Sequence, residues 1–286
     1  MIHAATAPWW IWPLALFAVS FAIGIVAVLG GIGGGVLFVP IVGGFFPFHL
    51  DFVRGAGLVF ALAGTLAAGP TLLRSRMASL RLVMPLALAG SVASFAGAVV
   101  GLSLPTDTLQ TALGVTVIVI AVLIAVSKDG YTGVVESDAL GAALRMKGHY
   151  QDPALGARID WRTHRTLAGF AAFGAIGFVG GLFGLGAGFA NVPALNLLMA
   201  APLKVAVGSS GLIISIINSS AAWVYIQRGA LLPILAVPAI LGVMLGSRIG
   251  ARLLAVTPAQ TVRRVVVVAM LLAGARALLR GLGLWT

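Results

Sequence analysis

The sequence predicts an all-α polytopic membrane protein, and three observations support this prediction. Hydrophobic residues make up 60% of the 286 residues and charged residues only 9%, with a mean hydropathy of +1.10. A soluble domain would carry roughly a quarter charged residues. Apolar stretches of about 20 residues recur, which is the length that crosses a hydrocarbon core of about 30 Å. Two glycine-rich motifs also interrupt apolar sequence at equivalent places in the two halves, as in secondary transporters.

The predicted order is five apolar segments, a polar linker and five more apolar segments. We expect these segments at about 10–29, 36–47, 52–73, 82–102, 107–127, 166–183, 187–200, 205–227, 230–254 and 260–283. The first run, from Trp9 to Leu29, lacks the basic region of a cleavable signal and is taken as a retained helix. We therefore divide the chain into an N-terminal transmembrane repeat (1–127), a cytoplasmic linker (128–165) and a C-terminal inverted transmembrane repeat (166–286).

The second set of segments repeats the first at a constant offset of 153 positions. Glycine and proline fix backbone bends, so their coincidence indicates a duplication more strongly than shared apolar residues would. The matching pairs are Gly24 and Gly177, Pro40 and Pro193, Gly55 and Gly208, Pro85 and Pro238, Ser94 and Ser247, Gly97 and Gly250, and Pro105 and Pro258.

Five segments per repeat would turn the second copy upside down in the membrane, and the charges agree with this inversion. The loop after the third segment is basic in the first copy, and the loop after the fourth segment is basic in the second copy. The basic residues are Arg74, Arg76 and Arg81 in the first loop and Arg248, Arg252, Arg263 and Arg264 in the second. The positive-inside rule then places these loops and the linker in the cytoplasm and both termini outside. Arg276 and Arg280 do not fit this pattern.

The glycine motifs at 31–35 and 184–188 each open a segment too short to cross the membrane. A helix of about 14 residues spans about 21 Å, so 36–47 and 187–200 are expected to be half-helices that start inside the membrane. Their unbonded amides and positive dipole ends would form a site for a small anion. The expected backbone donors are Gly33, Gly34, Gly35, Val36, Gly186, Ala187, Gly188 and Phe189. The alternative is that these glycines only allow close helix packing.

Several polar side chains could contribute to the same site. Asn191 lies in the first turns of the second half-helix, and Ser209 and Ser210 are expected to open the following helix as caps or ligand donors. Thr65 and Asn218 occupy equivalent positions, and either could bind a ligand or bond neighbouring helices. Lys204 and Arg54 are assigned to a vestibule, although the favoured interpretation of Lys204 is that it anchors the protein at lipid headgroups.

Other classes of protein receive little support from the residues. The net charge of +11 comes from loops and segment ends, which favours membrane orientation over nucleic-acid binding. The chain has no cysteine, and its histidines are scattered, so no metal, cofactor or catalytic residue is predicted. No Asp or Glu lies in the middle of an apolar segment, where it would indicate a cation or proton relay. The linker could form a small hairpin or a helix, and it could be a tether or a regulatory module.

At these motifs the sequence resembles the TauE/SafE sulfite exporter family, also called the TSUP family, from about Gly24 to Ala273. The resemblance rests on 31–35 with Pro40, on 184–188 with 192–196, on 202–210, and on 147–152 with 155–156 in the linker. It implies export of small sulfur oxyanions or organosulfonates across the bacterial inner membrane. Ala187 departs from the glycine that the family usually has there, which would narrow access to the backbone.

The sequence therefore predicts a multi-pass secondary transporter of small sulfur-containing anions that works by alternating access and is not an enzyme. Its predicted partners are the anion and the lipid bilayer, with no nucleic acid, and a homodimer is left open. The alternatives are an anion channel of the same fold, a permease for another small carboxylate or sulfonate, and a membrane-embedded enzyme or assembly subunit.

Overall fold

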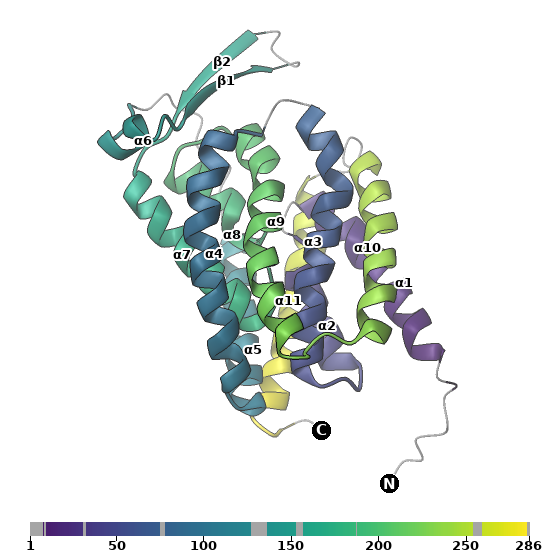
Figure 1. The fold of residues 1–286 in the computed structure, drawn as a ribbon. Coiled ribbons are helices and arrows are strands. Elements are labelled where there is room, and N and C mark those ends of the chain that lie inside the picture. Colours follow the sequence, from purple (N-terminus) through teal and green to yellow (C-terminus); the bar gives the residue numbers. More distant parts are fainter. Residues whose placement is uncertain are drawn as a thin grey trace.

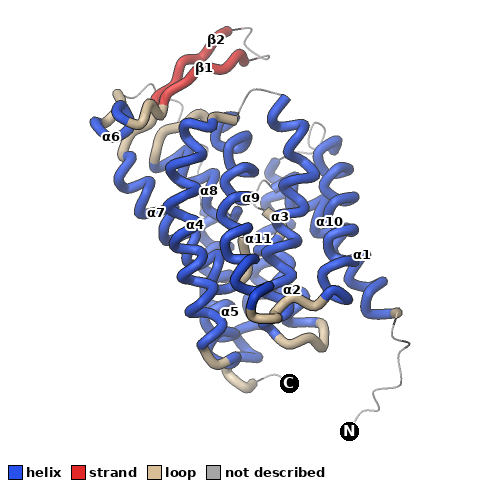
Figure 2. Tube along the Cα trace, viewed as in Figure 1, coloured by secondary structure: helices blue, strands red, loops and turns tan. Residues whose placement is uncertain are grey.

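The computed structural model describes residue 8 and residues 10–30, 33–74, 78–126, 136–152, 157–186, 188–253 and 259–284. Long helices run side by side through the molecule, and a small hairpin stands at one end of them (Figures 1 and 2). Within these ranges, seven helices are long and apolar enough to cross a membrane. The expectation of a mostly helical polytopic membrane protein is therefore confirmed.

The elements before the linker follow the predicted apolar segments. They are α1 (Ile11–Gly30), α2 (Gly35–Phe45), α3 (Leu50–Arg74), α4 (Leu80–Ser103) and α5 (Thr106–Val126). Four of these are long, whereas α2 has only 11 residues. Nearly every residue of α2 is buried, and its sequence is apolar all round, as expected of a helix enclosed by other helices.

The elements after the linker follow the later predicted apolar segments. They are α7 (Thr166–Phe183), α8 (Gly188–Pro193), the π-helical turn η1 (Ala194–Leu198), α9 (Leu203–Gln227), α10 (Pro233–Leu253) and α11 (Ala259–Gly281). The directions of the helices differ between the halves in Figure 1. There α3 ends and α4 begins at the hairpin end, whereas α9 ends and α10 begins at the opposite end.

Pairs of helices pack in a pattern that recurs between the halves. α1 packs on α10 as α7 packs on α4, α3 packs on α10 as α9 packs on α4, and α2 packs on α3 as α8 packs on α9. Glycine contacts recur in the same way. A Cβ on Gly24 would lie 3.0 Å from the carbonyl oxygen of Val243, and a Cβ on Gly177 would lie 2.9 Å from Cα of Gly90. Val243 lies 153 positions after Gly90, so the two close approaches are equivalent.

The linker contains both structures that its sequence left open. It forms α6 (Ala139–Ala143) and an antiparallel hairpin of β1 (Lys147–Asp152) and β2 (Ala157–Arg162). The described ends of α1 and α11 nearest the termini lie at the far end of the helices from this hairpin (Figure 1). Trp161 of β2 and Met146 are buried in one cluster with Leu195 and Met199 of the second half. The hairpin is therefore packed onto the helices at its base.

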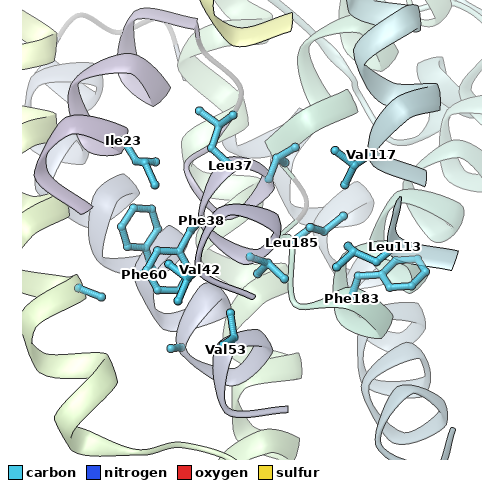
Figure 3. Close-up of a cluster of buried hydrophobic side chains, with 14 of the residues drawn as sticks. Ile23, Leu37, Phe38, Val42, Val53, Phe60, Leu113, Val117, Phe183 and Leu185 are labelled. Atoms are coloured by element: carbon cyan, nitrogen blue, oxygen red, sulfur yellow. The ribbon is translucent and has the colours of Figure 1, made fainter. Parts of the chain in front are cut away.

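The larger apolar core surrounds α2. Phe38 of α2 stacks on Phe60 of α3 with ring centroids 4.5 Å apart. Side chains from α1, α5 and the end of α7 complete the cluster in Figure 3, including Ile23, Val117 and Phe183. Shape-complementary packing of this kind fixes the position of α2 inside the protein.

Candidate functional site

The two glycine motifs meet inside the protein. In the first half, the described part of α1 ends at Gly30, and α2 begins at Gly35. Gly33, between them, has a φ of +68°, a conformation that glycine adopts without steric cost. A Cβ on Gly33 would lie 3.1 Å from Cα of Gly188, and a Cβ on Gly35 would lie 2.8 Å from the carbonyl carbon of Leu185. Gly33 and Gly35 therefore lie against the second motif, whereas a Cβ on Gly34 would meet the Phe60 ring of α3.

The start of α2 has the geometry of a helix N-terminus. The first backbone hydrogen bonds run from the amides of Leu37 and Phe38 to the carbonyl oxygen of Gly34, at 3.1 and 2.9 Å. The amides of Gly35 and Val36 precede these bonds and belong to the group of amides that a helix leaves without internal partners. This places two potential donors at the point where the motifs meet.

The second motif also leaves helical geometry, between Phe183 and Gly188. Gly184 and Gly186 have φ values of +67° and +72°. A Cβ on Gly186 would lie 2.7 Å from Nδ2 of Asn218, so this side chain of α9 lies beside the motif. Ala187 falls outside the described residues, and nothing is described of the Phe189 side chain.

Asn191 has the most informative environment of the predicted side chains. It lies in α8, one turn after Gly188, and is 0% exposed. Its Oδ1 and Nδ2 atoms have no hydrogen-bond partner among the described residues, and neither has Oγ of the buried Ser210. A buried polar group left without a partner costs about 1–3 kcal/mol. A water or a ligand is needed to satisfy such a group, so Asn191 is the strongest site candidate.

Other predicted side chains have partners within the protein. Oγ of Ser209 accepts a hydrogen bond from the amide of Ser79 at 3.2 Å. Oγ1 of Thr65 donates to backbone carbonyls of its own helix and lies 3.0 Å from Oγ of Ser215. Thr65 thus joins α3 to α9. The expectation that Ser209 and Ser210 open a helix is wrong, because α9 begins at Leu203 after Pro202, whose fixed φ favours a helix start.

Arg54 is 0% exposed and holds several helices together. Its Nη1 donates to Oδ1 of Asp51 at 2.7 Å and to the carbonyl oxygen of Gly101 at 3.2 Å. Its Nη2 donates to the carbonyl oxygen of Leu182, and its guanidinium carbon lies 5.2 Å from the centroid of the Tyr225 ring. Lys204, the other residue assigned to a vestibule, lies in the first turn of α9, and its side chain is outside the described part.

Arg276 and Arg280, which do not fit the charge pattern of the sequence, bond the end of α2. Nε of Arg276 donates to the carbonyl oxygen of Gly44 at 2.6 Å, and Nη1 of Arg280 donates to that of Gly43 at 2.8 Å. These carbonyls belong to the last turn of α2, where intrahelical partners run out. The guanidinium carbon of Arg276 also lies 4.0 Å from the centroid of the Phe45 ring. The two arginines therefore cap the C-terminus of α2.

Comparisons with known proteins agree with this architecture. The family model described as Sulfite exporter TauE/SafE matches residues 16–277. A "Probable membrane transporter protein YunE" from Bacillus subtilis (strain 168) is 28% identical over 120 residues, which make up 42% of this chain and 44% of that protein. The chain thus aligns with less than half of that relative's length. No solved structure matches the chain significantly. Because the family match spans nearly all of its residues, the chain belongs to the sulfite exporter TauE/SafE family of membrane transporters.

Proposed function

We propose that this chain is a secondary transporter that exports small sulfur-containing anions, such as sulfite or organosulfonates, by alternating access. The observation that carries the proposal is the buried Asn191 amide, which has no described partner and lies one turn after the contact between Gly33 and Gly188. An oxyanion at this point would satisfy Nδ2 of Asn191 and the first amides of α2 together. Anions are favoured at a helix N-terminus by its amides and dipole.

The proposal includes an inverted repeat of five segments, in which α2 and α8 with η1 are half-helices. Three observations support it: the recurring helix pairs, the opposite directions of α3 and α9, and glycine contacts that recur at an offset of 153. In such repeats the substrate binds where interrupted helices meet, and one repeat rocks against the other around it. The meeting of the two breaks is therefore where the substrate is expected.

We further propose that the hairpin end faces the cytoplasm of a bacterial inner membrane. Exposed arginines gather in the linker and near the ends of α4, α10 and α11 that lie toward it. They are Arg81, Arg145, Arg162, Arg165, Arg248 and Arg264. Excess Lys and Arg on one side orients membrane proteins with that side in the cytoplasm. Arg276 and Arg280 on the other side are engaged with backbone carbonyls of α2 and are not free loop charges.

The test begins with the purified protein in detergent. Sulfite, thiosulfate, sulfoacetate, taurine and lactate are compared for the thermal stabilisation they give. A bound anion stabilises the folded state by an amount that grows with the logarithm of its concentration relative to Kd, and reaches about 2.7 kcal/mol at one hundred times Kd. We expect at least one sulfur-containing anion to stabilise the wild type, and Asn191→Leu to lose that stabilisation.

Flux in proteoliposomes then distinguishes a carrier from a channel. A carrier shows saturation and counterflow, whereas a channel gives conductance that does not saturate and no counterflow. Failure of every anion to stabilise the protein or to be transported would contradict the proposed substrate class. Conductance without counterflow would contradict alternating access.

A further inference from the structure

Two side chains hold the carbonyl end of α7 at the second glycine break. Tyr225 donates its hydroxyl to the carbonyl oxygen of Gly181 at 3.1 Å and lies 3.4 Å from that of Leu182. Arg54 donates to the same Leu182 oxygen. α7 ends at Phe183, so both carbonyls belong to its last turn and lack intrahelical partners. In a dry interior such carbonyls must be satisfied by the protein, and a cation at a helix C-terminus is also favoured by the helix dipole.

The backbone of Arg54 touches the break as well. Gly184 continues the chain with a φ of +67°, and a Cβ there would lie 2.7 Å from the carbonyl carbon of Arg54. The segment from Leu182 to Gly184 is thus held by both the side chain and the main chain of one residue. From Gly184 the chain runs directly to Gly186, beside Asn218, and to Gly188, beside Gly33. The position of the proposed anion site therefore depends on where Arg54 holds this segment.

Arg54 is itself fixed by groups from other helices. Asp51 neutralises its charge from one turn earlier in α3, and the Gly101 carbonyl of α4 accepts a further hydrogen bond. The Tyr225 ring of α9 lies under the guanidinium group. Arginine suits this role because its planar fork presents several donors in fixed directions, which lysine cannot do.

The first half has no counterpart of this arrangement in its sequence. The residue 153 positions after Arg54 is Val207, and the residue 153 positions before Tyr225 is Leu72. Neither side chain has a hydrogen-bond donor. The pair Arg54 and Tyr225 is therefore specific to the second break.

We propose that Arg54, supported by Tyr225, is a positioning residue that sets the geometry of the anion site by fixing the end of α7. The predicted effect of Arg54 on anion binding rests on the proposed function. The predicted effect of Arg54 on the backbone of the second break does not. Arg54 does not contact the anion itself. Its loss releases the segment from Gly181 to Asn191 and weakens anion binding without removing any group that binds the anion.

The test compares Arg54→Gln, Arg54→Lys and Tyr225→Phe with Arg228→Gln, a matched control at an exposed arginine just after α9. Amide hydrogen exchange over residues 181–191 is measured in detergent without any anion. The apparent affinity for sulfite, sulfoacetate and lactate is measured by thermal shift. We expect Arg54→Gln to speed exchange in this segment and to weaken anion affinity, each by about tenfold or more. Arg54→Lys should restore part of both losses, and Arg228→Gln should match the wild type.

The outcomes separate this inference from the proposed function. Wild-type exchange over 181–191 in both Arg54→Gln and Tyr225→Phe would overturn it, as would faster exchange with unchanged anion affinity. If no anion stabilises the wild type, the proposed function fails, and the exchange measurement still decides whether Arg54 fixes the break. If Arg54→Gln does not fold, Tyr225→Phe, which keeps the ring and removes one hydroxyl, provides the test.

Discussion

The break between α1 and α2 and the break between α7 and α8 occupy equivalent positions in the chain, but different groups hold them. At the first break the stabilised element is the short helix after it, because Arg276 and Arg280 bond the last carbonyls of α2. At the second break it is the long helix before it, because Arg54 and Tyr225 bond the last carbonyls of α7. The polar side chains that hold the two breaks therefore differ, although the glycines at the breaks match at the constant offset of 153 positions.

The same difference appears at the proposed anion site. Asn191 in α8 corresponds to Phe38 in α2, Ser210 to Gly57, and Ala187 to Gly34. Phe38 is fully buried against Phe60, whereas Asn191 is fully buried without a described partner. In the proposed site, the first half would contribute backbone amides and apolar packing, and the second half would contribute the side-chain polarity. A site of this kind would hold an anion asymmetrically between two similar backbones.

The largest expected effect comes from the contact between the two breaks. Gly33→Ala should strongly reduce anion flux in proteoliposomes, because its Cβ would lie 3.1 Å from Cα of Gly188, which is closer than ordinary van der Waals contact. The positive φ adds about 1–2 kcal/mol of strain. Gly229→Ala is the control, since Gly229 also has a positive φ, of +67°, but a Cβ there meets nothing within 4 Å. Normal flux in Gly33→Ala would mean that the contact between the breaks is not part of transport.

Asn191→Leu and Phe38→Leu, at equivalent positions, should have opposite effects: the first should impair transport and the second should impair stability. Asn191→Leu replaces an unsatisfied amide with an apolar group of similar size, so thermal stability should stay equal or rise, because such replacements remove a desolvation cost of about 1–3 kcal/mol. Flux should fall at least about tenfold, since a hydrogen bond to a charged ligand is lost. Stability is read from thermal unfolding and transport from proteoliposome flux.

Phe38→Leu, at the equivalent position, should lower stability by about 1 kcal/mol through poorer packing and leave binding of the anion headgroup intact. If Asn191→Leu instead destabilises the protein and transports normally, Asn191 is a structural residue and the polar half of the site lies elsewhere.

Substituting an arginine of α11 tests the support of the first break, because these arginines bond the C-terminal end of α2. Arg276→Gln should leave the Gly44 carbonyl without its charged donor and lower stability by about 1–3 kcal/mol. Amide exchange should rise near the end of α2 and not near residues 181–191, which Arg54 controls. Arg228→Gln again serves as the exposed control. Equal exchange changes at both breaks would show that they do not have separate supports.

Much of the architecture could be predicted because it depends on patterns that a sequence carries directly. Apolar runs of membrane-spanning length predicted the long helices, and the spacing of glycines and prolines predicted where α2 and α8 begin. Asn191 was proposed as a ligand candidate because it lies in the first turns of the second short helix, and this assignment stays a prediction. These inferences need only local sequence and the length of a helix.

The supports of the breaks could not be predicted, because each is a contact between distant parts of the chain. Arg54 was assigned to a vestibule, and the structure buries it against α4, α7 and α9. Arg276 and Arg280 do not fit the positive-inside rule as free charges, but they bond the carbonyls of residues 44 and 43. A charge count treats every arginine as a free loop charge, so it cannot recognise one that caps a helix 230 or more positions away.

The smallest expected effect concerns the far end of α7, which the linker holds. Oδ1 and Oδ2 of Asp138 accept hydrogen bonds from the hydroxyl and the amide of Thr166, at 2.7 and 3.0 Å. Burial raises the pKa of Asp138, but the hydrogen bonds, chiefly those from Thr166, lower it by more. The pKa of Asp138 therefore lies below the ordinary value of 3.8. A carboxyl whose pKa is lower in the folded than in the unfolded protein stabilises the fold at any pH above the unfolded-state pKa. This stabilisation is lost as the pH falls through the folded-state pKa.

Asp138→Ala should therefore lower the free energy of unfolding at pH 7 by about 1 kcal/mol, the usual value of a helix-capping side chain. The difference from wild type should shrink once the pH falls below about 4, where the carboxyl of the unfolded chain begins to protonate, and it should continue to shrink as the folded protein is protonated at lower pH. Asp138→Asn, which keeps one acceptor oxygen, should lose less at pH 7 and show less dependence on pH. Thermal unfolding of the three proteins between pH 7 and pH 3 measures this. Because Asp138 is remote from both breaks, amide exchange over 181–191 should not change, and an increase there would show that the linker controls the second break.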